Sequence, residues 1–164
     1  MYSSDLSDVI NFANFMTFSA PPAPVNSYGN VSAASIAHGR VLFTSNAVGC
    51  AFCHTPSMPT GSSPSPALSQ QTANLFSDLL VHHMGSGLAD GINQGSAAGD
   101  EFRSAPLWGL GQRIYFLHDG RTDDLMQAIQ QHSSPGSEAN GSVGAFSNLS
   151  PSEQQDILNF LRSL

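Results

Sequence analysis

Residues 50–54, Cys-Ala-Phe-Cys-His, constrain this chain more than any other feature of its sequence. Two cysteines spaced C-x-x-C and followed at once by a histidine are typical of covalent attachment of a c-type haem. One helical turn places both thiols under the two vinyl edges of a porphyrin, and the next imidazole then points at the iron. We therefore expect Cys50 and Cys53 to form thioethers to one haem c, with His54 as the proximal ligand.

Other uses of this motif fit the chain less well. A redox dithiol or disulfide is expected in a thioredoxin-like β-α-β context, and no such strand pattern precedes Cys50. A structural zinc site needs four ligands, whereas the chain has two cysteines in all and no H-x₃₋₅-H pair to complete such a set.

Composition limits the classes of partner. The formal net charge is −7, with five arginines and no lysine, which argues against nucleic-acid binding because phosphate neutralisation needs clustered cations. An acidic surface suits a basic redox partner. The 164 residues suffice for one domain, and 15 glycines, 10 prolines and 10% charged residues predict long irregular loops around a cofactor that supplies part of the core.

The sequence contains neither a membrane span nor an export signal. No run of about 18 apolar residues exists, and residues 1–18 lack the cationic start and apolar stretch of a signal peptide. Covalent haem c is normally assembled after export, so we expect a periplasmic or extracellular protein whose signal peptide is not in this chain.

A weak internal repeat links the two ends of the chain. Residues 4–12, SDLSDVINF, echo residues 152–160, SEQQDILNF, and both have the apolar spacing of short amphipathic helices. Two unrelated helices of similar period could also look alike. If the echo is real, residues 1–18 form the closing helix of a preceding haem domain, residues 19–30 form a proline-stiffened linker, and residues 31–164 form the cytochrome c domain.

Within that domain the pattern predicts three helices and two loops. Helices are expected over residues 31–44, over 122–132 with Thr122 or Asp123 as the cap, and from Ser150, where Ser-Pro-Ser-Glu forms a capping box. Residues 55–69 and 85–99 are expected to be loops, and residues 75–82 are apolar but ambiguous. An early helix, the haem motif and a closing helix predict a mainly α, cytochrome c-like, single-haem domain with long irregular loops.

The ligand opposite His54 is less clearly marked. His132 follows Ile129 by three residues and Leu125 by seven, which places it on the apolar stripe of its helix. It could equally be a histidine at a helix C-terminus that interacts with the dipole and solvent. Met84, beside a glycine-rich loop, is an alternative ligand or a core methionine. The complete set of candidates is His38, His82, His83, His118, His132, Met16, Met58, Met84 and Met126.

Five segments taken in order carry a family resemblance: CAFCHTP, FSDLLVHHMGSGLADG, EFRSAPLWGLG, FLHDGR and QAIQQH, all between residues 50 and 132. The chain resembles, over roughly residues 36–164, the C-terminal haem domain of the di-haem oxidoreductase family, also called thiol oxidoreductase-like. This family is related to bacterial di-haem cytochrome c peroxidases. The ordered set is more specific than the haem signature alone.

The resemblance implies roles for three further residues. In the related peroxidases a distal methionine follows an F-H-[DS]-G turn at the end of the next helix, and His132 occupies that place here. This favours iron ligation by His54 and His132. Arg103, in a stretch similar to F-R-x-P-x-L, and His118, in the turn, become candidates for orienting a ligand or pairing with haem propionates. The family carries two haem motifs, whereas this chain has one.

We therefore expect an electron-transfer domain with one low-spin, bis-histidine haem, more an electron carrier than a catalyst on its own. The alternative is a peroxidase- or oxidase-type haem enzyme, or a fragment of one, with a displaceable sixth ligand. The expected partner is a redox protein or a second haem domain. Self-association of single-haem units is also compatible with the sequence.

Overall fold

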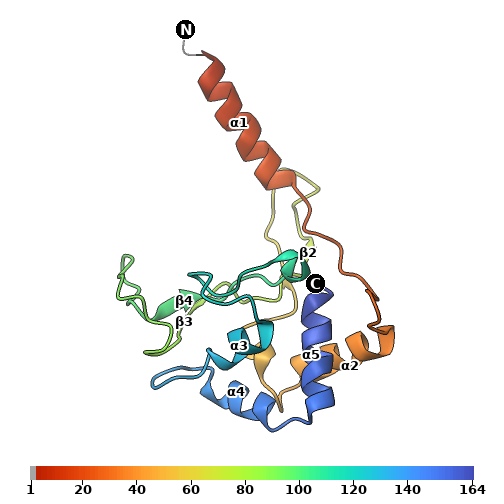
Figure 1. Cartoon of the computed structure of the whole chain (residues 1–164). Coiled ribbons are helices and arrows are strands. Elements are labelled where there is room, and N and C mark those ends of the chain that lie inside the picture. The colour runs from red at the N-terminus through yellow and green to blue at the C-terminus, as the bar shows by residue number, and fades with distance from the viewer. Residues whose placement is uncertain (1–2) are drawn as a thin grey trace.

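The computed structural model describes residues 3–164, with side chains described from Ser7 onward. A long helix, α1 (Ser3–Phe18), projects from the body of the molecule, and residues 19–32 connect it to the rest (Figure 1). The body contains the other four helices, which are α2 (Ala33–Thr44), α3 (Leu125–Gln130), α4 (Asn140–Ser147) and α5 (Pro151–Arg162). Two 3₁₀ turns complete the helical part, η1 (Cys50–Phe52) and η2 (Leu110–Gln112).

The predicted mainly α class is wrong, because the body is mixed α/β. Strands β1 (Met58–Pro59) and β2 (Thr72–Ala73) form one antiparallel pair, and β3 (Val81–His83) and β4 (Glu101–Arg103) form another. Both pairs lie in segments rich in proline, serine and glycine. A helix cannot satisfy the backbone there at low cost, so short cross-strand pairs do so instead.

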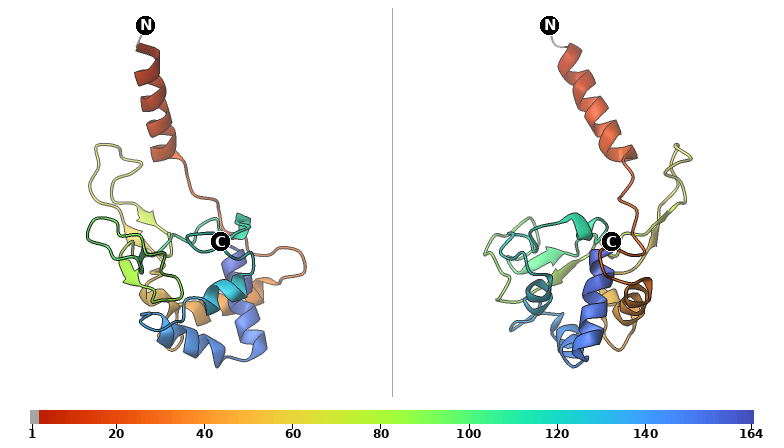
Figure 2. Two further views of the ribbon diagram at one scale, coloured as in Figure 1. Left: turned by 60° about the vertical axis from the view of Figure 1, so that its left-hand side comes forward. Right: turned by 45° about the vertical axis from the view of Figure 1, so that its right-hand side comes forward.

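Helices α2 and α5 pack directly against each other, as all three views show (Figures 1 and 2). Gly39 of α2 makes this approach possible, because a Cβ atom there would collide with the backbone carbonyl of Asp156 in α5. The same contact is tied by polar groups, since Asp156 accepts hydrogen bonds from Ser35 and pairs with His38 Nδ1 at 2.7 Å. Asn159 Nδ2 donates to Ser35 Oγ at 2.9 Å.

The ends of the helices follow the expected capping chemistry in part. Helix α5 has the complete capping box, in which Ser150 and Glu153 each accept a hydrogen bond from the other's backbone N–H and Pro151 occupies the first helical position. Helix α2 is capped by Ser32. Helix α3 is capped by Asp124 rather than by Thr122 or Asp123, and it ends at Gln130, so His132 lies in the turn after the helix.

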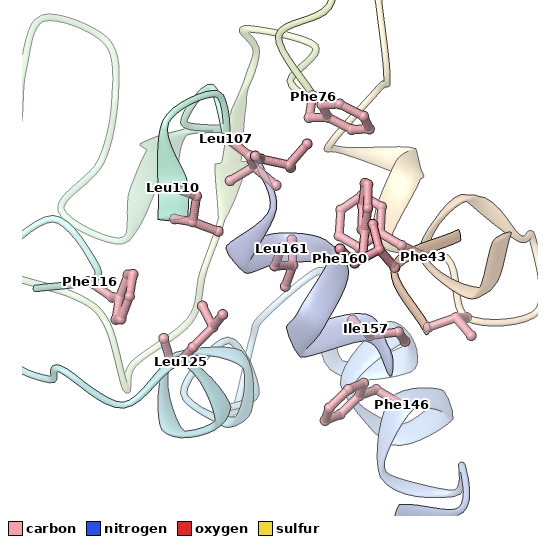
Figure 3. Close-up of a cluster of buried hydrophobic side chains, with 14 residues drawn as sticks. Phe43, Phe76, Leu107, Leu110, Phe116, Leu125, Phe146, Ile157, Phe160 and Leu161 are labelled. Atoms are coloured by element: carbon pink, nitrogen blue, oxygen red, sulfur yellow. The ribbon is translucent and has the colours of Figure 1, made fainter. Parts of the chain in front are cut away.

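The hydrophobic core joins residues that are far apart in the sequence (Figure 3). Three aromatic rings form its centre: Phe160 lies 5.5 Å from both Phe43 and Phe76, measured between ring centroids, and Phe43 lies 6.2 Å from Phe76. The contacts of Phe76 with the other two rings are edge-on and that between Phe43 and Phe160 is tilted, and such geometries are favoured over face-to-face stacking. Phe43 lies just before the haem motif in the chain and Phe76 follows it, so this cluster fixes the motif against α5.

Candidate functional site

The body encloses a cavity of about 500 Å³, within the range typical of sites for bound small molecules and cofactors. Its walls are largely apolar, with contributions from Phe43, Leu107, Leu110, Phe116, Val143, Phe146 and Leu161. Every residue that we expected around a haem also lies on this wall: Cys50, Cys53, His54, Met84, Arg103, His118 and His132. Residues separated by 82 positions are thus brought to one space.

The two cysteines lie on and just after the short turn η1. Gly49 precedes the turn with φ +80°, a conformation that a glycine adopts without strain. Both cysteines are free thiols rather than a disulfide. Burial raises the pKa of Cys50 to about 11, and burial followed by the negative charge of Asp78 raises the pKa of Cys53. Both groups are therefore neutral thiols at pH 7.

A neighbouring segment holds the motif in place through backbone hydrogen bonds. The N–H groups of residues 76, 77 and 78 donate to the carbonyls of residues 56, 55 and 53, at 3.3, 2.9 and 2.9 Å. Phe76 adopts φ +51°, which is uncommon for a bulky residue, so the surrounding structure must impose it. Its carbonyl accepts a hydrogen bond of 3.0 Å from His54 Nδ1.

This hydrogen bond decides the tautomer of His54. A carbonyl can only accept, so the proton is on Nδ1 and the lone pair is on Nε2. Burial lowers the pKa of His54 to about 4, and the Phe76 carbonyl only partly opposes this effect. His54 is therefore neutral at pH 7 and has an Nε2 lone pair for a metal, with Nδ1 anchored as is usual for metal-ligating histidines.

His132 has the same arrangement on another part of the wall. Its Nδ1 donates to the carbonyl of Ala128 at 2.7 Å, which leaves Nε2 as the unprotonated nitrogen. Burial is the main cause that lowers the pKa of His132, so this imidazole is also neutral. The helix ends before His132, but the hydrogen bond back to Ala128 fixes the ring against the cavity.

His82 also lines the cavity, but its ring nitrogens have other partners. Nε2 lies 2.9 Å from Asp78 Oδ2, and Nδ1 lies 3.0 Å from Glu138 Oε2 and 3.6 Å from Cys53 Sγ. Burial by itself lowers the pKa of His82, but the hydrogen bonds with Glu138 and Asp78 outweigh it and raise the pKa. With a carboxylate beside each ring nitrogen, His82 is held away from a role as an iron ligand.

The side chains of the remaining histidines, His38, His83 and His118, also contact other groups. His38 pairs with Asp156 between α2 and α5, and His83 pairs with Asp100 at 3.0 Å near the surface. His118 stacks on Phe102 with ring centroids 4.2 Å apart and lies 3.9 Å from Asp90. His118 thus lines the cavity as part of a stacked pair.

Of the methionines considered as ligands, Met84 lies on the cavity wall. Its backbone forms a bridge with Ser137 and its carbonyl accepts from Ser134 Oγ at 3.1 Å, so the segment is well fixed. Met58 pairs with Ala73 in the first hairpin, Met126 packs against the core, and Met16 is exposed on α1.

The sequence did not mark two charged residues of the wall, Arg113 and Glu138, nor Asp78, whose carboxylate contacts the wall residue His82. Arg113 Nη2 donates to the carbonyl of Pro106 at 3.1 Å, and its side chain lines the cavity together with Arg103. Two of the five cations in the chain thus face this space. Their scarcity was the one signal in the sequence that could have marked Arg113.

The residues present fit a haem. The cavity is apolar, has two neutral imidazoles with free Nε2 lone pairs and two thiols on its wall, and adds two guanidinium groups that suit carboxylates. Within residues 3–164 no cluster of three or more histidine, cysteine or acidic side chains is arranged to hold a bare metal ion. The donor set therefore suits iron that is held in a macrocycle.

A protein-family model described as "Di-haem oxidoreductase, putative peroxidase" matches residues 4–164 of the chain. The chain belongs to this family. The predicted family resemblance is thereby confirmed, and a haem-binding redox role agrees with it. The match begins within α1, so the di-haem oxidoreductase pattern includes the projecting helix as well as the body.

A solved structure has the same fold. The chain superposes on Kuenenia stuttgartiensis hydrazine synthase, pressurised with 20 bar xenon, with a TM-score of 0.60 and 19% sequence identity. The superposition covers 92% of this chain and 52% of that one, so the di-haem oxidoreductase chain spans about half the length of its structural neighbour. At this identity the likeness concerns the fold alone. No curated protein matches the sequence.

None of the helices in the described part of this family member combines the length and the apolar character needed to cross a bilayer.

Proposed function

We propose that this di-haem oxidoreductase family member is an electron-transfer domain with one low-spin haem c, covalently bound through Cys50 and Cys53 and ligated by His54 and His132. One observation carries the proposal: two neutral imidazoles on the wall of one apolar cavity each have Nδ1 anchored to a backbone carbonyl and Nε2 left as the metal-binding atom.

The haem supplies one-electron chemistry when bound, and the chain controls where its ligands lie. Hydrogen bonds to the carbonyls of Phe76 and Ala128 fix the two imidazole rings, so both would hold their positions as ligands in either charge state of a bound haem. The apolar side chains of the walls would shield a bound haem from water over most of its surface. Two imidazole ligands keep the reduction potential lower than a histidine–methionine pair would.

A spectrum of the purified haem protein tests this ligation. Low-spin ferric features without the absorption band of a methionine–iron bond are expected, whereas a high-spin resting spectrum contradicts bis-histidine ligation. His132→Ala should convert the iron to high-spin, and His132→Met should restore a low-spin state with a raised potential. His83→Ala, at an exposed histidine outside the cavity wall, is the matched control and should leave the spectrum unchanged.

The second candidate is a peroxidase-type haem enzyme, which the family's description favours. It requires a sixth ligand that leaves the iron, and Met84 lies on the same wall as His132. Peroxide added to the reduced protein, with an excess of a small-molecule electron donor to supply the two electrons that each peroxide takes up, separates the two functions. Rapid turnover that persists in Met84→Leu but not in His54→Ala would favour the enzyme, and slow oxidation without turnover would favour the electron carrier.

The partner that we propose is a second haem domain or a separate redox protein. The family name supports the first, because it specifies two haems, whereas this chain has a single haem motif. A periplasmic or extracellular location remains our prediction from the chemistry of haem attachment.

A further inference from the structure

Helix α1 exposes a continuous set of large apolar side chains. Six of them are more than half exposed: Val9, Ile10, Phe12, Phe15, Met16 and Phe18. The helix projects from the body in every view, and its apolar side chains take no part in the core cluster (Figures 1 and 2). An exposed apolar surface of this extent marks an interaction site.

Helix α5 shows what this sequence pattern packs against. When residues 4–12 are aligned with residues 152–160, Asp8 corresponds to Asp156, Val9 to Ile157, and Phe12 to Phe160. In α5 the two apolar positions are buried, with 1% and 2% of their surface exposed, whereas in α1 they are 65% and 66% exposed. The two positions that are buried in the core in α5 are thus exposed to solvent in α1.

The polar positions of the pattern also have a defined role in α5. Asp156 binds Ser35 and His38, and Asn159 donates to Ser35 Oγ. These contacts all go to α2, whose residues 35–39 read Ser-Ile-Ala-His-Gly and whose Gly39 lets α5 approach closely. In α1 the same positions are Asp8 and Asn11, and both are exposed.

We propose that α1 closes a second haem domain of this fold by packing on that domain's counterpart of α2. Val9 and Phe12 would enter its core, Asp8 would pair with a serine and a histidine, and a glycine would lie at the crossing point. The partner element that packs on α1 is thus a helix with the sequence pattern Ser-x-x-His-Gly. The proposal rests on the proposed function in one respect, namely that the partner domain carries haem.

Hydrogen exchange in a tandem chain tests the proposal. A copy of residues 31–150, which is the body without α5, is fused to the N-terminal side of residues 3–164. In this tandem chain α1 can take the place of the missing α5 in the added copy. We expect the amides of residues 9–12 to exchange at least 100-fold more slowly than in the 164-residue chain. Val9→Asp combined with Phe12→Asp should remove this protection. Ser7→Gln, at the position that matches exposed Gln155, is the control and should retain it.

Two results would overturn the proposal. One is equal exchange of α1 in the tandem and in the 164-residue chain. The other is a dimer of the 164-residue chain, detected by native mass spectrometry, that Val9→Asp and Phe12→Asp abolish, because the occupant would then be a second copy. The number of haems bound by the 164-residue chain is measured separately, so a failure of the proposed function is distinguishable from a failure of α1 docking.

Discussion

At the scale of single residues, backbone carbonyls orient the two candidate ligands of the haem site, and a few charged side chains surround the cavity. His54 and His132 reach the same cavity from distant parts of the sequence, and each is oriented by one backbone oxygen. Charged groups are divided around the cavity, with Arg103 and Arg113 on the wall and Glu138 beside His82. Each of these charges supports a prediction.

Arg103→Gln and Arg113→Gln should each lower the reduction potential by tens of millivolts. A nearby cation stabilises the reduced iron, which carries one positive charge fewer, and such an interaction is worth on the order of 1 kcal/mol at the effective dielectric of a protein site. Redox titration of the holoprotein measures the shift. Arg40→Gln, on α2 and outside the cavity wall, is the control. A potential that does not change in either cavity variant would argue against a site for propionates at these arginines.

His82 should stabilise the fold below about pH 6.5, the ordinary pKa of histidine. Its pKa is raised in the folded state, so its contribution is complete below its ordinary pKa and is lost as the pH rises through the raised value. Asp78 and Glu138 act in the opposite sense, since their lowered pKa values contribute stability above about pH 4.5 that is lost on acidification. His82→Gln should therefore reduce the urea midpoint more at pH 5.5 than at pH 8.5. Equal losses at both pH values would contradict this account.

At the scale of elements, the contact between α2 and α5 is the structural basis of the body. Gly39→Ala should destabilise the protein by about 1–3 kcal/mol, the usual cost of forcing atoms into a packed contact. Gly144→Ala is the matched control: its Cβ meets nothing within 4 Å, and alanine in a helix is favoured by about 0.5–1 kcal/mol over glycine. Denaturant unfolding of both variants measures the difference. Equal stabilities would show that α5 can move away from α2 at little cost.

The elements with strong local signals could be predicted from the sequence. The final helix was predictable because Ser150, Pro151 and Glu153 form a local capping signal, and the structure confirms it. Helix α4 was missed because its sequence, NGSVGAFS, contains two glycines, and it depends on burial of Val143 and Phe146 rather than on propensity. The two sheets were missed because strands of two or three residues carry no periodicity.

In the candidate site, too, features set by neighbouring residues could be predicted, whereas features set by tertiary contacts could not. The haem motif was visible because its spacing is local. His132 was singled out from an assumed helix stripe, but the helix ends before it, and its orientation depends on one hydrogen bond to Ala128. Arg113 could not be assigned to the cavity wall from the sequence, because no motif around it indicates a binding site.

At the scale of the whole molecule, the chain consists of a packed body and a helix that stands apart from it (Figure 1). Such a molecule should not unfold as one unit. Amides of α1 should exchange within seconds, because an isolated helix of about 15 residues is marginally stable in water, whereas amides of α5 should exchange at the rate of global unfolding. Hydrogen exchange with mass spectrometry on the 164-residue chain measures both. Slow exchange in α1 would mean that the helix is already covered.

Phe76 joins two parts of the molecule that are usually treated separately. Its ring packs against Phe43 and Phe160 in the centre of the core, while its carbonyl holds the imidazole of His54. We therefore expect a displacement of Phe76 from the core to release that imidazole from its hydrogen bond. The visible absorption of the haem protein would then report on the packing of its core. On heating, the spectrum should begin to change at the temperature at which the aromatic cluster begins to loosen.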